Sequence, residues 1–192
     1  MTTASIVKGL QNNKIVMFVA SEKLYKDSLT SVAKQAQSLF SSIAFLSYRA
    51  PGATLESQLA KAGVKTKNCF FIDVLTANVK KASAGSNILF VNSPADLNEV
   101  GVAASELIKT GKFHFLLFDG PGAMLLYQDY DIVLQFIHNI ITKCRVAGVQ
   151  LAFFAIDVAA NKELIKDLHL FVDEVVDLGA PIADEKLVEA FR

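Results

Sequence analysis

The residues after the first apolar run of the chain lie where a phosphate loop would be expected. Ile15 to Val19 is predicted to be a buried strand, and a helix is predicted to follow it. A phosphate loop at such a junction reads G-x-x-x-x-G-K-[ST], because its glycines let backbone N–H groups face the phosphate and its lysine reaches across. On that pattern Ala20 and Tyr25 replace the glycines and Asp27 replaces the hydroxyl residue, so that Lys26 alone fits. The chemistry of the motif is therefore missing.

A non-standard phosphate site at residues 21–28 is the alternative interpretation of this junction. The first turn of a helix favours an anion because its N–H groups are unpaired and its dipole is positive there. Against this, Glu22 and Asp27 place two carboxylates in the same turn, where they would repel an anion. We therefore prefer to interpret Ser21 as the N-cap of the helix. If a nucleotide binds, the residues expected to hold it are Ser21, Lys23, Lys26 and Asp119.

Carboxylates follow several predicted strands, at the edge where parallel sheets bind ligands. The apolar run ending at Phe118 and followed by Asp119 has the form of a Walker B element, which organises magnesium in nucleotide hydrolases. An aspartate that caps the turn after a strand has the same form, so no metal site is assigned. A small-molecule site around Tyr48, Arg49 and Asp119 stays open. The other candidates at these strand ends are Asp73, residues 119–122 and Asp157.

The histidines and cysteines form no catalytic or metal-binding pattern. His114 is expected within a strand, His138 within a long helix and His169 at the end of an apolar helix, each in a structural role. Cys69 and Cys144 lie in apolar contexts at no metal-ligand spacing, so we expect buried thiols in a reducing compartment. The sequence thus predicts no catalytic residue, no metal ligand and no cofactor.

Composition predicts one domain, residues 1–192, with an extensive core, because 52% of the residues are hydrophobic and 20% are charged. Nineteen acidic and nineteen basic residues leave no net charge to hold nucleic acid or an anionic membrane. The basic cluster has no interleaved aromatic residue and is expected to be a solvated face. No apolar run approaches the ~18 residues of a membrane span, and no signal peptide is recognised, so a cytoplasmic protein is expected. The cluster comprises Lys61, Lys65, Lys67, Lys80 and Lys81.

Short apolar runs alternate with segments of helical period, which predicts a three-layer α/β/α sandwich with a mainly parallel sheet. The expected strands are Ile15 to Val19, Ile43 to Ser47, Cys69 to Ile72, Ile88 to Val91, Phe113 to Phe118, Val149 to Ile156 and Phe171 to Val176. The expected helices are Leu24 to Phe40, Leu55 to Ala62, Ala95 to Lys109 and Asp129 to Ala147. Ser93 is expected to cap the third helix, Gly148 to end the fourth, and Ile132 to face inward. Val74 to Asn87 is expected to be the longest loop.

From Ile15 to Gly179 the order of segments resembles the RecA superfamily core, most closely KaiC-like domains of the archaeal type. The resemblance rests on IAFLSYRAPGATLESQLAKAGV, on NILFVNSPADLNEVGVAASELI and above all on FHFLLFDGPGAMLLYQDYDIVLQFIHNIITKCRVAGVQLAFFAID. It implies a RecA-like α/β fold with the core topology of P-loop NTPases. In active relatives, it implies that ATP binds between a phosphate loop and a Walker B acid. Such relatives often assemble into rings of several copies.

The chain departs from that family pattern at the active site. The phosphate-loop glycines and the Ser/Thr are absent, and Asp119 is followed by Gly-Pro where active relatives commonly have Asp-Ser. Of the active-site residues of the family, only the lysine and the Walker B aspartate have counterparts in this chain, namely Lys26 and Asp119. Our leading hypothesis is a non-catalytic pseudo-ATPase domain that serves signalling or regulation through a protein partner or self-association, without nucleic acid or membrane. The competing hypothesis is a nucleotide-binding protein or weak ATPase that uses residues 21–28.

Overall fold

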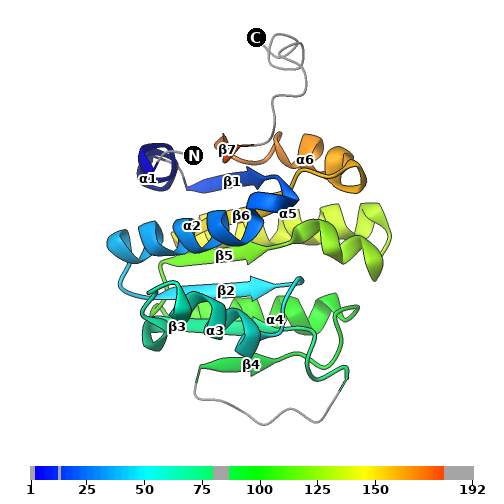
Figure 1. Ribbon diagram of the computed structural model, residues 1–192. Coiled ribbons are helices and arrows are strands. Elements are labelled where there is room, and N and C mark those ends of the chain that lie inside the picture. The colour runs from blue at the N-terminus through cyan, green and yellow to red at the C-terminus, as the bar shows by residue number, and fades with distance from the viewer. Residues whose placement is uncertain (1–2, 13, 80–86, 180–192) are drawn as a thin grey trace.

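A seven-stranded sheet, in which every pairing is parallel, forms the centre of the molecule (Figure 1). The computed structural model describes residues 3–12, 14–79 and 87–179. The strand order is β4-β3-β2-β5-β6-β1-β7. All the expected strands are found, with small shifts at their ends. They are β1 Ile15–Ala20, β2 Ile43–Ser47, β3 Cys69–Asp73, β4 Ile88–Phe90, β5 Phe115–Asp119, β6 Gln150–Ile156 and β7 Glu174–Asp177.

Helices cover both faces of the sheet and complete a three-layer sandwich (Figure 1). Buried residues of α1, α2 and α3 pack on one face, and those of α4, α5 and α6 pack on the other. The α-helices are α1 Thr3–Asn12, α2 Tyr25–Leu39, α3 Gly52–Lys61, α4 Leu97–Lys109, α5 Tyr130–Ala147 and α6 Lys162–Leu168. The 3-10 helices are η1 Glu22–Leu24, η2 Thr66–Asn68, η3 Pro121–Leu126 and η4 Ala159–Asn161. Among the residues described, no helix is long and apolar enough to cross a membrane.

The central strands are apolar on both sides because each side faces a helix layer. In β1, Val16 and Phe18 join the core under α1 and α2, whereas Ile15 and Met17 join the core under α5. All four side chains are completely buried. The continuous apolar runs that predicted the strands therefore reflect two separate cores, one on each side of the sheet.

The start of α4 corrects the prediction that Ser93 caps this helix. The cap is Asp96, whose Oδ1 accepts a hydrogen bond from the N–H of Glu99 at 3.0 Å. Ser93 instead accepts a hydrogen bond from the N–H of Ala95 through its Oγ, within the turn that precedes the helix. An aspartate nearer the first helical turn can satisfy the same unpaired donors, so the serine is not needed there.

Two further expectations were wrong. Ile132 was expected to face inward and is 44% exposed, because the buried stripe of α5 begins one residue later, at Val133. His114 was expected within a strand, but it is exposed and directly precedes β5. Helix α1 was not predicted. The expected long loop, Val74 to Asn87, lies partly outside the described residues.

Three other local expectations, for Gly148, the cysteines and the placement of His138, are confirmed. Gly148 ends α5 with a φ of 70°, a left-handed conformation that glycine adopts without strain. Both cysteines are buried, and neither forms a disulfide. His138 lies on α5, exposed, with its ring 5.2 Å from that of Phe171.

Candidate functional site

The carboxylate of Asp119 lies at the end of β5, is completely buried, and accepts hydrogen bonds on both of its oxygens. The hydroxyl of Tyr25 lies 2.8 Å from Oδ1 and 2.8 Å from Oδ2, and donates its proton to this carboxylate. The hydroxyl of Ser47, at the end of β2, donates to Oδ2 at 2.9 Å. Residues from three separate elements therefore meet at the acid that resembles a Walker B aspartate.

Strand order explains why a residue as long as tyrosine is needed to reach Asp119. Tyr25 follows β1, and β6 lies between β1 and β5. Two strand spacings separate the axes of β1 and β5 by about 10 Å. The ring of Tyr25 crosses this gap against Phe154 of β6, edge to face, with 5.5 Å between ring centroids. Tyr25 thus reaches across the end of β6 to Asp119.

Arg49 covers the outer side of Tyr25. The Cζ of its guanidinium lies 4.5 Å from the centre of the Tyr25 ring, a cation–π contact. The stem of Arg49 passes close to Gly120, which has a φ of 72° and no room for a Cβ. The glycine that follows Asp119 thus allows the arginine to lie across the end of β5.

Burial sets the protonation of this cluster. It raises the pKa of Asp119 from 3.8 to about 6, although the hydrogen bonds from Tyr25 and Ser47 and the charge of Arg49 act in the opposite direction. Burial, followed by the negative charge of Asp119, raises the pKa of Tyr25 well above its usual value of 10.0. Tyr25 therefore remains a hydrogen-bond donor throughout the physiological range of pH.

The junction at residues 21–28 is a 3-10 turn followed by a helix. The N–H of Leu24 donates to the carbonyl of Ser21 at 3.0 Å, and the N–H of Tyr25 donates to the carbonyl of Glu22. Two backbone donors of the bend are therefore already paired within it. Leu24 occupies the N-cap position of α2, and Ser21 makes no capping hydrogen bond with its side chain. The prediction that Ser21 caps this helix was wrong, because the intervening turn moves the helix start.

The four residues expected to hold a nucleotide lie in different environments. Asp119 is buried beneath Tyr25, Ser21 is half-buried, and Lys23 and Lys26 are exposed on the surface. Groups of three or more side chains that could ligate a metal ion are absent from the described part of the chain. The binding of a nucleotide by these four residues stays the alternative prediction.

Asp73, another acid at a strand end, is held in a structural role. Its buried carboxylate accepts hydrogen bonds from the N–H of Gly52 at 2.7 Å, and from the N–H groups of Leu75 and Thr76 at 2.9 Å each. The hydroxyl of Thr76 donates to it as well, at 2.7 Å. Asp73 thus ties the start of α3 to the turn after β3. Asp157 is half-buried, and its backbone N–H donates to Ala20.

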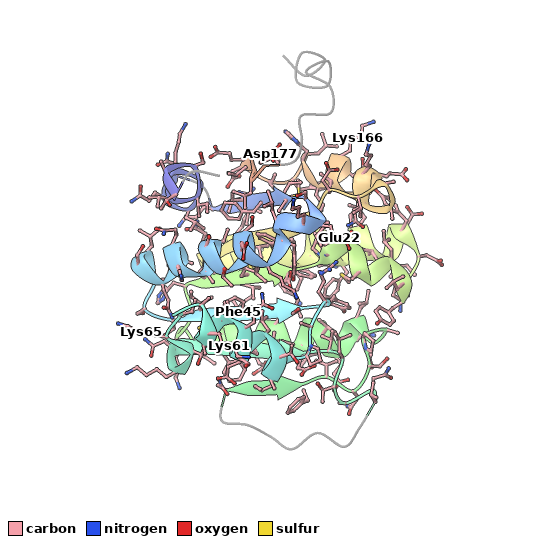
Figure 2. The ribbon with its side chains drawn as sticks, viewed as in Figure 1. Glu22, Phe45, Lys61, Lys65, Lys166 and Asp177 are labelled. Carbon is pink, nitrogen blue, oxygen red and sulfur yellow. The ribbon has the colours of Figure 1, made fainter. Side chains whose placement is uncertain are left out.

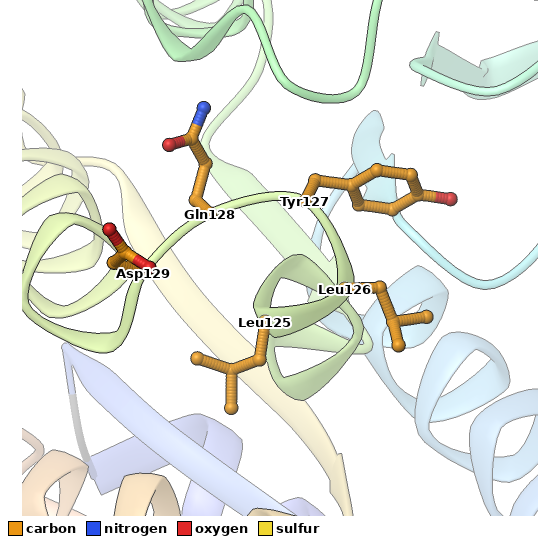
Figure 3. A pocket seen from close by; sticks show the side chains of 5 residues that line it. All are labelled: Leu125, Leu126, Tyr127, Gln128 and Asp129. Atoms are coloured by element: carbon orange, nitrogen blue, oxygen red, sulfur yellow. The ribbon is translucent and has the colours of Figure 1, made fainter.

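Tyr48, which was considered part of a small-molecule site, is buried. Its hydroxyl donates to the carbonyl of Pro94 at 3.2 Å, and its ring stacks on that of Phe118. Residues 125–129 line a shallow pocket of about 280 Å³, and the ring of Tyr127 in this segment lies 6.4 Å from that of Tyr48 (Figure 3). Leu126 is 81% exposed there, and the side chain of Gln128 donates to the carbonyl of Ala95 at 2.7 Å.

Sequence reasoning missed three features of the site. Ser47 and Asn161 were not considered as site residues. The side chain of Asn161 lies so close to Gly122, in the turn after β5, that a Cβ added to Gly122 would collide with it. Tyr25 was treated as the loss of a glycine, and its bond to Asp119 was not foreseen.

No protein-family model matches the sequence, and no curated protein matches it. Two solved structures from Pyrococcus horikoshii share its architecture. The KaiC-like protein PH0186 of strain OT3 aligns with a TM-score of 0.60 and 12% identity, over 89% of this chain and 74% of its own. PH0321, an uncharacterised protein in complex with an unknown peptide, aligns with a TM-score of 0.65 and 10% identity, over 90% of this chain and 80% of its own. The chain therefore has an α/β fold of the KaiC-like, RecA type.

Proposed function

We propose that this chain is a non-catalytic domain of RecA/KaiC-like fold, a pseudo-ATPase that acts in regulation or signalling by binding another protein. The observation that carries the proposal is the bond between the hydroxyl of Tyr25 and the buried carboxylate of Asp119, at 2.8 Å to each oxygen. Tyr25 stands where a phosphate loop would have its second glycine. The hydroxyl of Tyr25 thus binds both oxygens of the carboxylate that a nucleotide–magnesium complex would need.

The energy needed to displace Tyr25 supports the absence of nucleotide binding. Breaking a hydrogen bond to a charged group costs roughly 2 kcal/mol, and removing the ring from its buried position costs about 2 kcal/mol more. A ligand that displaced the ring would lose roughly a thousandfold in affinity, because each 1.4 kcal/mol is a factor of ten. Two N–H groups of the bend, already paired within the turn, would offer little in compensation.

A protein partner is supported by the surface next to this cluster. Leu126 and Tyr127 are 81% and 37% exposed there, and both line the shallow pocket formed by residues 125–129. PH0321, which shares the fold, was solved in complex with an unknown peptide. The buried free thiols Cys69 and Cys144 suit a reducing compartment, so we infer a cytoplasmic protein.

Calorimetric and thermal-shift titration with magnesium ATP, ADP and GTP tests the proposal. A nucleotide at 100 times its dissociation constant would stabilise the folded state by about 2.7 kcal/mol. We expect no heat of binding and no shift in Tm at millimolar concentrations, and no hydrolysis by the purified chain. Exposed Lys26→Ala should leave every one of these readings unchanged.

The competing function, nucleotide binding through residues 21–28, makes the opposite prediction. A shift in Tm with magnesium ATP that Lys26→Ala abolishes would establish it and would refute the proposal. Lys34→Ala is a matched control, because Lys34 is also an exposed lysine of α2, but lies outside the 21–28 segment. Tyr25→Gly, which restores one glycine, separates the two ideas further. Nucleotide binding that appears in this variant alone would show that the tyrosine excludes the ligand.

A further inference from the structure

Exposed lysines collect where β3 and β5 begin. Lys67 and Lys112 lie just before these two strands, which are separated in the sheet by β2 alone. Two strand spacings place the starts of β3 and β5 about 10 Å apart. Figure 2 shows Lys61 and Lys65 toward the same end of the molecule. We call this surface the lysine patch; its exposed members are Lys61, Lys65, Lys67, Lys109 and Lys112.

Acids are scarce in the segments that form the lysine patch. Residues 57–72 and 107–118 contain no aspartate or glutamate. Glu106 pairs with Lys109 at 3.1 Å, and half-buried Glu56 already accepts a hydrogen bond from a side-chain amide at 2.7 Å. The other four lysines have no ion-pair partner within the described part of the chain. The patch therefore carries a local excess of positive charge, although the chain as a whole is neutral.

Helix dipoles explain two of these lysines and leave three unexplained. A base in the last turn stabilises a helix, and Lys61 and Lys109 are the last residues of α3 and α4. Lys65, Lys67 and Lys112 lie outside the α-helices. Helix stability therefore gives no reason for the second half of the patch.

An aromatic pair lies beside the lysines. Phe70 and Phe113 have 5.7 Å between their ring centroids, and both are half-buried. Phe113 directly follows Lys112, and Phe70 comes three residues after Lys67. Ile108, also half-buried, belongs to the same side of the core. A partly exposed apolar surface flanked by positive charge is suited to a ligand that carries both negative charge and apolar side chains.

The chemistry of the patch favours an acidic protein segment over nucleic acid. All five of its basic members are lysines, which offer a point charge rather than the planar fork with which arginine grips phosphate. The rings of Phe70 and Phe113 are inclined at 57° and pack against each other. Binding of single strands uses open ring faces on which bases stack. Carboxylates need no such platform.

We propose that the lysine patch binds an acidic segment of a partner protein, in which an apolar side chain between the acids contacts Phe70 and Phe113. The inference rests on the proposed function as a protein-binding domain, and it names the chemistry of the partner. Attraction between exposed charges is screened by salt, so this contact is strongest at low ionic strength.

Fluorescence anisotropy with short labelled peptides tests the proposal on the full chain. The probe is a peptide of repeated Glu-Glu-Phe, and its neutral counterpart repeats Gln-Gln-Phe. We expect the acidic peptide to bind at about 50 mM salt and at least about tenfold more weakly at about 500 mM, where the Debye length is a few ångströms. The neutral peptide should bind at least about tenfold more weakly than the acidic one at low salt.

Charge-reversed variants locate the binding surface. The patch variant should weaken binding of the acidic peptide at least about tenfold. It is Lys65→Glu, Lys67→Glu, Lys112→Glu. The control variant makes the same change in net charge with exposed lysines of α1 and α6, beside the β7 edge of the sheet, and should leave binding unchanged. It is Lys8→Glu, Lys162→Glu, Lys166→Glu. Circular dichroism checks folding, and glutamine replaces glutamate in any variant that does not fold.

The apolar contact has its own test. Phe113→Ala should weaken binding of the Glu-Glu-Phe peptide about fivefold and leave a Glu-Glu-Ala peptide unaffected, because only the first peptide has a ring to place on the aromatic pair. Leu170→Ala is the control, since Leu170 is 79% exposed and lies outside the patch. Equal weakening of both peptides by Phe113→Ala would contradict the apolar contact.

Three outcomes would overturn the acidic-segment proposal. They are no binding of the acidic peptide at low salt, equal binding by the patch and control variants, and tighter binding of an oligothymidylate or of phosphatidylserine vesicles than of the peptide. A chain that binds neither the acidic peptide nor a nucleotide would refute this inference and leave the proposed pseudo-ATPase function intact. Binding of the acidic peptide together with magnesium ATP would do the reverse, provided that the patch variant still binds the nucleotide.

Discussion

At the scale of single residues, the pKa of Asp119 makes the stability of the protein depend on pH. Burial raises this pKa from 3.8 to about 6, so the folded protein keeps a proton that the unfolded chain releases between these two values. The stability contributed by protonated Asp119 is therefore complete below pH 3.8 and is lost as the pH rises through about 6. A change of roughly two pKa units corresponds to about 3 kcal/mol.

Tyr25→Phe should make that dependence steeper. Removing the hydroxyl removes a donor that favours the charged carboxylate, which raises the pKa of Asp119 further. We expect a loss in the free energy of unfolding of about 2 kcal/mol near pH 8 and about 1 kcal/mol near pH 5, measured by urea denaturation. Tyr48→Phe is the control, because Tyr48 donates to a neutral carbonyl and its loss should not depend on pH over this range. Equal losses at both pH values in Tyr25→Phe would contradict the assignment of a charged Asp119.

At the scale of elements, the turn after β5 holds Arg49 over Tyr25, and a pair of glycines separates two explanations for it. Gly120 and Gly148 have nearly the same φ, 72° and 70°. Nothing lies within 4 Å of a Cβ built on Gly148, whereas a Cβ on Gly120 would collide with Arg49. The two positions share the backbone cost of a left-handed residue and differ in the packing cost.

Replacing each glycine by alanine should therefore give different losses of stability. Gly148→Ala should cost about 1 to 2 kcal/mol, the penalty for a left-handed L-residue. Gly120→Ala should cost more, because Arg49 must also leave its place on the Tyr25 ring. Urea denaturation compares the two, and Arg49→Ala combined with Gly120→Ala should remove most of the excess. Equal losses in the two single variants would mean that the arginine stem is not held by the turn.

At the scale of the whole molecule, the path of the chain joins its two ends in one sheet. Strand β1 lies between β6 and β7, so the start of the described chain pairs with its end. No cut along the sequence divides this sheet into two complete sets of strands. We therefore propose that residues 1–192 form a single domain.

A single domain should unfold in one transition. Far-UV circular dichroism and tyrosine fluorescence, which reports on the four tyrosines of a chain without tryptophan, should give coincident urea curves. Curves with separate midpoints would instead reveal two units of different stability. Addition of salt is a useful control, since it changes surface electrostatics and should move both curves together.

The fold was predictable from the sequence because its determinants are local. Continuous apolar runs give the strands, and Gly148 marks the end of α5. Helix α1 was missed because just Ile6, Gly9 and Leu10 of its residues are buried, too few to form a clear stripe. The bond between Tyr25 and Asp119 was missed for another reason. It joins residues 94 positions apart, and the two elements that carry them are brought together by a strand that comes later in the chain.

Tyr25, the first residue of α2, is part of the chain and cannot dissociate from its site as a bound metabolite can. A metabolite occupies its site in proportion to its concentration, but the hydroxyl of Tyr25 is tethered beside Asp119 in every copy. Under the proposed function, the arrangement around β5 does not depend on the concentration of nucleotide in the cell. Under the proposed function, a change in the activity of the domain would therefore come from a protein that binds its surface.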